Sequence, residues 1–378
     1  MEFGTKLIHN GNEIDENTGA VSIPIYQTST FHQFDIENMG KYDYSRSGNP
    51  TREALENTIA ILEGGDRGFA FSSGMAGISS VLSIFSAGDH LLTCKDVYGG
   101  TYRITTEFLS KFNVETSFVD TSSLDEVRES IKPNTKAIFL ESPSNPLLKI
   151  TDLRAVIKIA KQYNLIVIVD NTFMSPYLQN PIKLGADIVV HSATKFIGGH
   201  SDVVGGLVVV KGQKLAERVY FVQNAFGAIL GPQDSWLLLR GLKTLKVRLD
   251  EQQENADKLA DFLSKHNKVK KVYYPGLPDH QGSYVHFSQA RGGGAVLSFE
   301  TKDIDTAIHF MKNVRLAAVA VSLGGVETIV SYPVKMSHAE IPREEREKLG
   351  ITDNLIRVSL GLENIYDLIE DFGRALDI

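Results

Sequence analysis

The residues best suited to chemistry form one short stretch around Lys195. A β-branched run, residues 187–190, predicts a buried strand that ends in the polar turn HSAT directly before this lysine. A lysine between small hydroxyl residues at the end of a buried strand can be a desolvated amine with a lowered pKa, able to act as a nucleophile. The hydroxyls of Ser192 and Thr194 are spaced to hold an anion such as a phosphate. An ordinary surface lysine on a polar loop explains the stretch equally well.

A second candidate anion site follows a predicted strand at residues 69–71. The residues SSGM, at 72–75, lead into an amphipathic helix. The backbone N–H groups of Gly74 and Met75 would be free in the first helical turn, where the helix dipole favours negative charge. The spacing matches neither GxxxxGK[ST] nor GxGxxG. A plain tight turn is the alternative.

Three other polar groups also follow predicted strands. Tyr98 lies beside two glycines after the strand at 89–93, and glycines allow a planar group to approach the backbone closely. Asn145 lies in a proline-rich loop after the strand at 136–140. Asp170 ends the apolar strand at 165–169. A carboxylate there is costly unless it meets a positive partner, which is either another side chain or a cationic ligand nitrogen.

Two candidate groups lie far from this region in the sequence. Residues 1–50 show little periodicity and predict an irregular arm that packs on something else, such as another subunit. Within this arm, Tyr44 and Arg46 either contact a phosphate or belong to an ordinary loop. Arg357 lies in an apolar strand, where an unpaired guanidinium would be expensive. Its partner is either a buried carboxylate of the chain or a substrate carboxylate held bidentately.

The elements that would position these groups alternate between strand and helix from about residue 67 to 210. This alternation predicts a mostly parallel sheet covered by helices on both faces. The candidate loops all follow strands, so they would converge on one edge, where ligands bind in such sheets. From about residue 269 the pattern predicts a smaller α/β domain with an antiparallel sheet. We expect an arm at 1–50, a large domain at 51–240 and a small domain at 241–378, with the boundary between 230 and 245.

Composition narrows the class of protein. A chain of 378 residues that is 42% apolar and 22% charged predicts a globular protein of two or three domains. The net charge of −7 disfavours a nucleic-acid or anionic-membrane partner. Cys94 is the only cysteine, and His191 and His200 show no metal-ligand spacing, so we expect neither a disulfide nor a metal site. Without a long apolar run or a signal peptide, a cytoplasmic location is expected.

Pyridoxal 5′-phosphate (PLP) requires the groups that these loops would bring together. It needs a lysine for a Schiff base and an acid that keeps its pyridine nitrogen protonated, so that the ring can act as an electron sink. It also needs an aromatic ring to stack on and donors for its phosphate. An arginine would orient the carboxylate of an amino-acid substrate.

Ordered sequence blocks resemble a known family over essentially the whole chain. The blocks YSRSGNPTR, FSSGMAG, DVYGGTYR, ESPSNP, VDNTF, HSATKFIGGHSD, SLGGVET and IRVSLGLE are similar to signatures of the transsulfuration enzymes, the Cys/Met-metabolism family of fold-type I PLP enzymes. The resemblance implies the fold-type I PLP-dependent transferase fold, an α/β fold whose large domain holds a mostly parallel seven-stranded sheet between helices. It also implies a homotetramer made of dimers with shared active sites.

The resemblance implies a role for each matched residue. Lys195 would bind the cofactor as a Schiff base and shuttle protons. Asp170 would face the pyridine nitrogen, and Tyr98 would stack on the ring and assist proton transfer. Tyr44 and Arg46 would reach the phosphate in a neighbouring subunit. The remaining matched residues would hold the cofactor (Gly74, Met75, Thr172, Ser192 and Thr194) or the substrate carboxylate (Asn145, Ser322 and Arg357).

The reaction within the family is also inferred from resemblance. The blocks STFHQ, VSLGGVET and MSHAEIPREEREKLGIT are most similar to members that cleave cystathionine by β-elimination to homocysteine, pyruvate and ammonia in methionine biosynthesis. Members that act at the γ-carbon often carry a glutamate where this chain has Val321. Methionine-cleaving members usually carry a cysteine where it has Gly100. The alternatives are γ-elimination of cystathionine or methionine, γ-synthesis of cystathionine, and a non-catalytic cofactor carrier.

Overall fold

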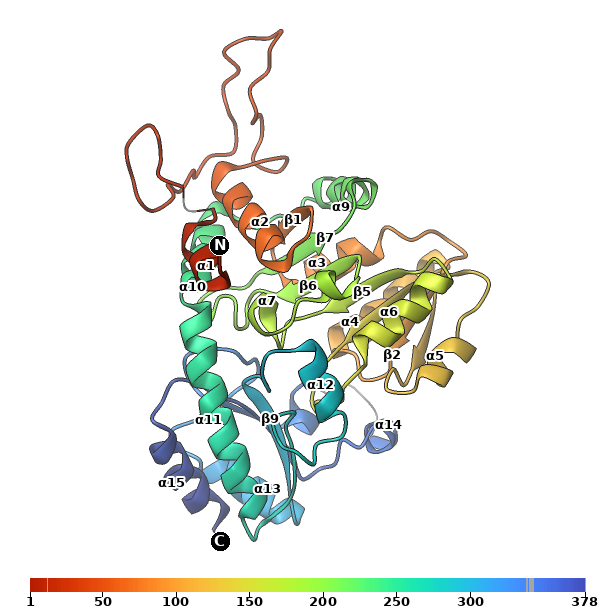
Figure 1. Cartoon of the computed structure of the whole chain (residues 1–378), viewed down its shortest axis with the longest axis vertical. Helices are drawn as coiled ribbons and strands as arrows, with labels where there is room; N and C mark the ends of the chain where they lie inside the picture. The colour runs from red at the N-terminus through yellow and green to blue at the C-terminus, as the bar shows by residue number, and fades with distance from the viewer. Residues whose placement is uncertain (12, 338, 340–342, 378) are drawn as a thin grey trace.

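The computed structural model describes residues 1–11, 13–337, 339 and 343–377, and it contains two sheets with helices packed around them (Figure 1). Part of the block at 336–352, which carries the family resemblance, therefore lies outside the described residues. The large sheet comprises β1 (Arg67–Phe71), β2 (His90–Cys94), β3 (Glu115–Val119), β4 (Thr135–Glu141), β5 (Ile166–Asp170), β6 (Ile188–Ser192) and β7 (Gly206–Val210).

The large sheet has seven strands in the order β1-β7-β6-β5-β4-β2-β3. The neighbours from β6 to β3 are parallel, whereas β7 runs antiparallel to both β6 and β1. The mostly parallel seven-stranded sheet is therefore confirmed. Four of the five β5 residues are buried, as expected for a strand covered on both faces.

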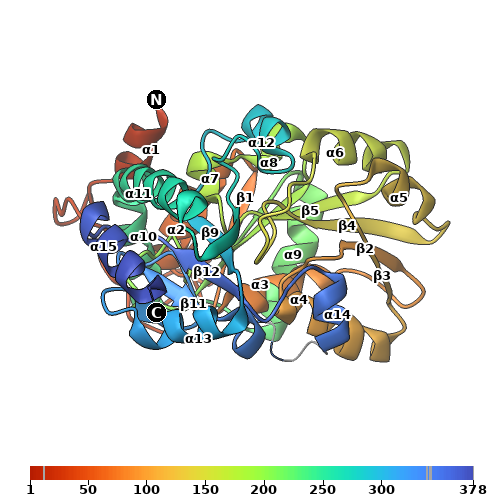
Figure 2. The same cartoon turned by 90° about the horizontal axis from the view of Figure 1, so that it is seen from below.

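Helices cover both faces of this sheet (Figure 2). On one face, α2 (Pro50–Glu63) and α6 (Leu153–Gln162) pack on odd-numbered residues of β5 such as Val167. On the other face, α3 (Gly74–Leu82) and α9 (Gln213–Phe226) pack on even-numbered residues such as Ile168. The alternation of side chains along each strand thus divides the core into two layers.

The second sheet has five strands in the order β10-β11-β12-β9-β8. Apart from the short parallel pair β10·β11, its neighbours are antiparallel, as predicted. Its strands are β8 (Val269–Tyr273), β9 (Val296–Thr301), β10 (Ala318–Val319), β11 (Ile329–Ser331) and β12 (Leu355–Ser359). The helices α11 (Leu245–Lys265), α13 (Ile304–Asn313) and α15 (Ile365–Leu376) share its core. Before α11, the expected boundary region contains α10 (Pro232–Lys243).

The N-terminal arm differs in one respect from the irregular segment that its sequence predicts. Residues Phe3–His9 form the helix α1, which contacts α2 and α10 and buries Leu7. The arm beyond α1 contains no further helix in its described part and extends away from the body in two loops (Figure 1). Within residues 1–11 and 13–49, the bridge between Thr30 and Tyr44 is the one place where the backbone pairs in strand fashion.

The remaining helices are short. They are α4 (Gly99–Arg103), η1 (Ile104–Phe108), η2 (Leu109–Phe112), α5 (Leu124–Glu129), α7 (Ser175–Leu178), α8 (Pro181–Leu184), α12 (Ser283–Gln289), η3 (Pro333–Lys335) and α14 (Arg343–Lys348). Among the described residues, no helix has the length and apolar character needed to span a bilayer.

Candidate active site

A cavity of about 860 Å³ lies at the carboxyl ends of the parallel strands, between the two sheets. It brings together most of the residues that the sequence singled out, from the ends of six different strands and the loops after them, and from β12. Those residues are Gly74, Met75, Tyr98, Asn145, Asp170, Thr172, Ser192, Thr194, Lys195, Ser322 and Arg357. The two residues of the arm, Tyr44 and Arg46, are not part of its lining.

Lys195 lies just beyond the end of β6, and its amine is largely buried. Its Nζ donates a hydrogen bond to Ser322 Oγ at 2.5 Å. Burial, and then the positive charge of Arg357, lower the pKa of Lys195 to about 8. Removing the amine from water disfavours its charged form, so a larger fraction is neutral and nucleophilic near neutral pH.

The start of α3 forms a cradle for an anion. Ser73 is the N-cap and accepts from the Ala76 N–H at 3.0 Å, which leaves the N–H groups of Gly74 and Met75 in the first turn without intrahelical acceptors. A Cβ on Gly74 would lie 2.9 Å from Ser192 Cβ, so the close approach of α3 to β6 requires glycine. Ser192 and Thr194 add hydroxyl groups to the same part of the cavity.

Asp170 ends β5 and is buried in the cavity wall. Burial raises the pKa of its carboxyl, and hydrogen bonds from Thr172 oppose the increase. The Thr172 N–H donates to Asp170 Oδ1 at 3.0 Å. Among the described residues Asp170 has no salt bridge, so the side-chain cation that the sequence left open is not found. A cationic group brought to this carboxyl would stabilise its charged form.

Arg357 is buried in β12 but is not held by a carboxylate of any described residue. Its Nη1 donates to Asn145 Oδ1 at 2.9 Å, and its Nη2 donates to Ser322 O at 2.7 Å and to Ser331 Oγ at 3.1 Å. Its Nε has no hydrogen-bond partner among the described residues. Because all its partners are neutral, the charge of the guanidinium remains available to an anion in the cavity.

Tyr98 precedes α4, and its side chain is 42% exposed at the cavity. Two close contacts explain why residue 100, two positions after Tyr98, is a glycine. A Cβ on Gly100 would lie 2.6 Å from Met75 Sδ and 2.7 Å from the Tyr98 ring. Because Gly100 has no side chain, the Tyr98 ring can pack against the backbone of its own turn, next to the start of α3.

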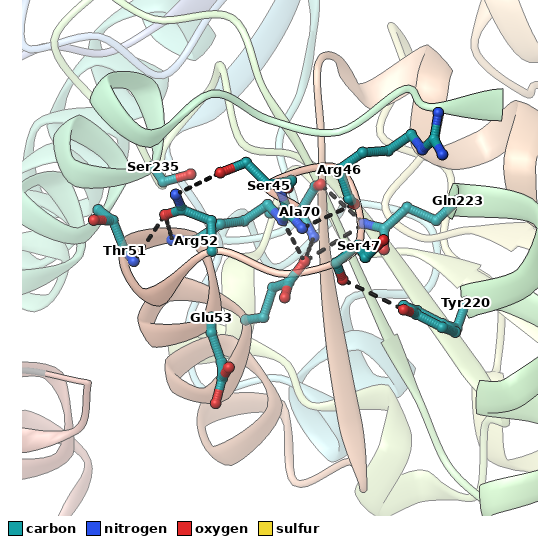
Figure 3. Close-up of polar contacts among 12 residues, drawn as sticks. Ser45, Arg46, Ser47, Thr51, Arg52, Glu53, Ala70, Tyr220, Gln223 and Ser235 are labelled. Carbon is teal, nitrogen blue, oxygen red and sulfur yellow. Dashed lines mark hydrogen bonds and ion pairs between the residues drawn. The ribbon is translucent and has the colours of Figure 1, made fainter. Parts of the chain in front are cut away.

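The turn that carries Tyr44 and Arg46 is held by α2 and by Tyr220 of α9, whose hydroxyl donates to Ser47 O at 3.4 Å (Figure 3). Arg52, buried on α2, donates to Ser45 O at 2.5 Å and to Arg46 O at 3.1 Å. The Arg52 guanidinium also pairs with Glu56 at 3.5 Å. The side chains of Tyr44 and Arg46 are exposed, and the Arg46 guanidinium lies 5.6 Å from the centre of the Tyr44 ring. The turn is thus fixed while its two side chains remain accessible.

The two histidines near Lys195 do not line the cavity. His191 Nε2 lies 2.7 Å from Glu63 Oε1 of α2, and both side chains are fully buried on the face of the sheet that α2 covers. His200 Nδ1 lies 2.8 Å from Gly198 O. These contacts indicate a structural role for both histidines.

Sequence reasoning missed several polar residues of the cavity wall, among them Ser331 and Glu141. Ser331 in β11 contacts Arg357, and no pattern in the sequence distinguishes it from other strand serines. Glu141 ends β4 and pairs in register with Asp170 at the end of β5. A carboxylate directly after a buried strand was the signal that identified Asp170, and the same signal applies to Glu141.

The residues of this cavity fit PLP. The buried amine of Lys195 can react with an aldehyde, and the start of α3 with two hydroxyl groups matches a phosphate. Asp170 is a buried acid without a counter-ion of its own, which suits a protonated ring nitrogen. The unpartnered Nε of Arg357 adds a donor for a carboxylate.

Comparisons with known proteins agree with this geometry. Residues 4–377 match the family model described as Cys/Met metabolism PLP-dependent enzyme. The chain is 58% identical to cystathionine beta-lyase MetC of Bacillus subtilis, over 98% of this chain and 95% of that protein. It is 52% identical to a cystathionine gamma-lyase of the same organism, over the full length of both. It also resembles the crystal structure of cystathionine gamma-lyase from Lactobacillus plantarum complexed with L-serine, with a TM-score of 0.96 and 48% identity over 99% of this chain and 98% of the other.

Proposed function

Because the chain belongs to the Cys/Met metabolism PLP-dependent enzyme family, we propose that it is a carbon–sulfur lyase that converts cystathionine to homocysteine, pyruvate and ammonia by β-elimination. One residue, Ser322, carries the structural argument. Its hydroxyl accepts from the Lys195 amine, and its carbonyl accepts from Arg357. This arrangement sets a reactive amine beside a carboxylate-binding guanidinium, as an amino-acid substrate requires. The identity of 58% to a cystathionine beta-lyase supports the choice of reaction.

We assign the cofactor-binding residues from the same geometry. When bound, PLP supplies an electron sink for the electron pair left by the departing α-proton. The N–H groups of Gly74 and Met75, with the hydroxyls of Ser192 and Thr194, would hold its phosphate. Asp170, supported by Thr172, would stabilise the protonated ring nitrogen, and the Tyr98 ring would cover one face of the pyridine.

The substrate and its protons are handled by a second set of residues. Arg357 would bind the substrate carboxylate bidentately, with Asn145 and Ser322 holding the guanidinium in place. The Lys195 Nζ in its neutral form would take the α-proton, and Tyr98 would assist that transfer. The bond between Cβ and sulfur would then break with its electron pair going to sulfur, and the thiolate would take a proton and leave as homocysteine. The remaining three-carbon unit would take up water to give pyruvate and ammonia.

We further propose that the active site is shared between subunits. Tyr44 and Arg46 are exposed and lie outside the cavity of their own chain. In a dimer they would reach the phosphate in the neighbouring subunit, and two dimers would form a tetramer. We propose the cytoplasm as the location of this assembly.

The γ-elimination of cystathionine is the second candidate, because a cystathionine gamma-lyase is 52% identical over the full chain. The products separate the two reactions. The purified protein with PLP is incubated with cystathionine, and the products are identified by mass spectrometry. We expect pyruvate and homocysteine, whereas 2-oxobutyrate and cysteine would instead establish γ-elimination. Lys195→Ala is the control and should abolish product formation.

A further inference from the structure

Glu141 occupies a position in the cavity wall that the proposed reaction does not use. It is the last residue of β4, is 6% exposed, and pairs in register with Asp170 of β5. Two carboxyl groups therefore end neighbouring parallel strands at the same edge of the sheet. Burial, and then the nearby Asp170 charge, raise the pKa of Glu141 well above its ordinary value. Burying such an acid is costly unless its oxygens accept hydrogen bonds, so the groups that it contacts are informative.

The contacts of Glu141 are with the backbones of two different loops. Its Oε2 accepts from the Tyr98 N–H at 3.0 Å, in the loop after β2. Asn145 lies four residues after Glu141, in the loop that follows β4 itself, and a backbone interaction from Asn145 lowers the pKa of the Glu141 carboxyl against the effect of burial. One loop carries the tyrosine assigned to the cofactor ring. The other carries the asparagine that holds Arg357 at 2.9 Å.

We propose that Glu141 is a positioning residue that fixes the Tyr98 loop and the Asn145 loop relative to each other. Through the Tyr98 loop it fixes the position of the ring that covers the cofactor. Through the Asn145 loop it fixes the position of the Arg357 guanidinium that binds the substrate carboxylate. Removal of this one carboxyl releases both loops together. The assignment rests on the proposed function for what the two loops bind, but the coupling between them is a property of the chain alone.

The coupling is tested on the apoprotein by hydrogen–deuterium exchange, which needs no substrate or cofactor. Glu141→Leu removes both acceptor oxygens, so we expect faster exchange at the Tyr98 and Asn145 amides together. Glu141→Gln keeps one acceptor oxygen and should release no more than one of the two amides. Wild-type exchange at both amides in the leucine variant, or faster exchange at only one, would overturn the proposal.

Glu300→Leu is the matched control. Glu300 is also a buried acid at 4% exposure and accepts from the Tyr273 hydroxyl at 3.0 Å, but it lies in β9 away from the cavity lining. A general loss of stability would lower the unfolding temperature of both leucine variants. Only Glu141→Leu should change exchange at Tyr98 and Asn145.

The loaded enzyme gives a second measurement. Displacement of both loops should lower kcat and raise KM for cystathionine, each by about tenfold or more, since small misplacements cost about 100-fold in rate. Glu141→Gln should lie between the leucine variant and wild type. A change in only one of the two constants in Glu141→Leu would contradict the shared role. If wild type forms no product, the proposed function fails, while the exchange result still decides the coupling.

Discussion

At the scale of single residues, the central feature is a lysine whose charge the fold disfavours. Lys195 is buried beside Arg357, and its amine meets a hydroxyl instead of a carboxylate. Burial without a counter-ion makes the amine reactive, and it also destabilises the protein whenever the amine is protonated. Reactivity and stability are therefore opposed at this residue.

This opposition predicts that Lys195→Met abolishes turnover yet stabilises the apoprotein. The pKa of Lys195 is about 8 in the fold against 10.5 for an ordinary lysine, so the unfolded chain binds more protons between these values. The penalty is full below pH 8 and disappears as the pH rises toward 10.5. At pH 7 we expect a gain of about 2–3 kcal/mol in the free energy of unfolding.

Urea unfolding of the two apoproteins from pH 7 to 10.5 measures the difference. The control Lys312→Met changes an exposed lysine of α13 and should give no gain at any pH. A gain in Lys195→Met that stays constant over this range would show that the charge of Lys195 is not its cause.

Most residues of the site could be predicted because a reactive or charged side chain occurs in the sequence directly at the end of a predicted strand. Asp170 and Lys195 directly follow apolar strands, and that edge of the sheet is where loops converge. Glu141 shares this signal, but its contacts with Tyr98 and Asn145 depend on how distant loops pack. The neutral partners of Arg357 could not be inferred either, because they come from three separate segments of the chain.

At the scale of elements, α2 both covers the sheet and anchors the arm. Asn49 caps it, since Asn49 Oδ1 accepts from the Thr51 N–H at 3.0 Å. The amide of the same side chain donates to Tyr26 O at 2.9 Å and to Ser45 Oγ at 3.1 Å. One buried side chain thus joins the helix start to two points of the arm.

The two functions of Asn49 can be separated by substitution. Asn49→Ala loses the cap and both arm contacts, so we expect it to lower the free energy of unfolding by about 2 kcal/mol. Asn49→Asp keeps the capping oxygen but not the amide donors, and should cost about half as much. Urea unfolding of the apoprotein measures both. Asn38→Ala, an exposed position in the arm, is the control and should change little. Equal losses in the alanine and aspartate variants would contradict a separate role for the cap.

Elements with strong local signals were predicted well, and the others depend on tertiary pairing. Asn49 and Pro50 at the start of α2 and the left-handed Gly64 at its end are residue types typical of helix termini. The strand β7 follows a glycine-rich loop, and only its pairing with β1 and β6 gives it a place in the sheet. The helix α1 lacks a recognisable start signal and is stabilised by packing on α2 and α10.

At the scale of the whole molecule, the cavity is assembled from both sheets. Arg357 belongs to the second sheet, and its partner Asn145 belongs to a loop of the first. If Tyr44 and Arg46 also cross to a neighbouring chain, as we propose, each site needs two subunits. Neither domain of one chain then contains a complete site.

Shared sites predict complementation between two inactive variants. Lys195→Ala removes the reactive amine, and Arg46→Ala removes the phosphate contact given to the neighbour. In a mixed dimer one site carries both defects and the other carries neither. Unfolding and refolding an equal mixture with PLP should therefore restore about one quarter of wild-type pyruvate formation. Either variant refolded alone is the control. Recovery no greater than the average of the two controls would contradict the shared site.

The contact between Asn145 and Arg357 also has a consequence for the order in which the enzyme is made. Chains emerge from the ribosome from the N-terminus at about 5–20 residues per second, so Arg357 appears about 10–30 seconds after Lys195. During that interval the chain contains the anion cradle and Lys195 without the guanidinium, and for most of it without Ser322. A nascent chain can thus acquire its phosphate-binding groups before it can select an amino acid by its carboxylate.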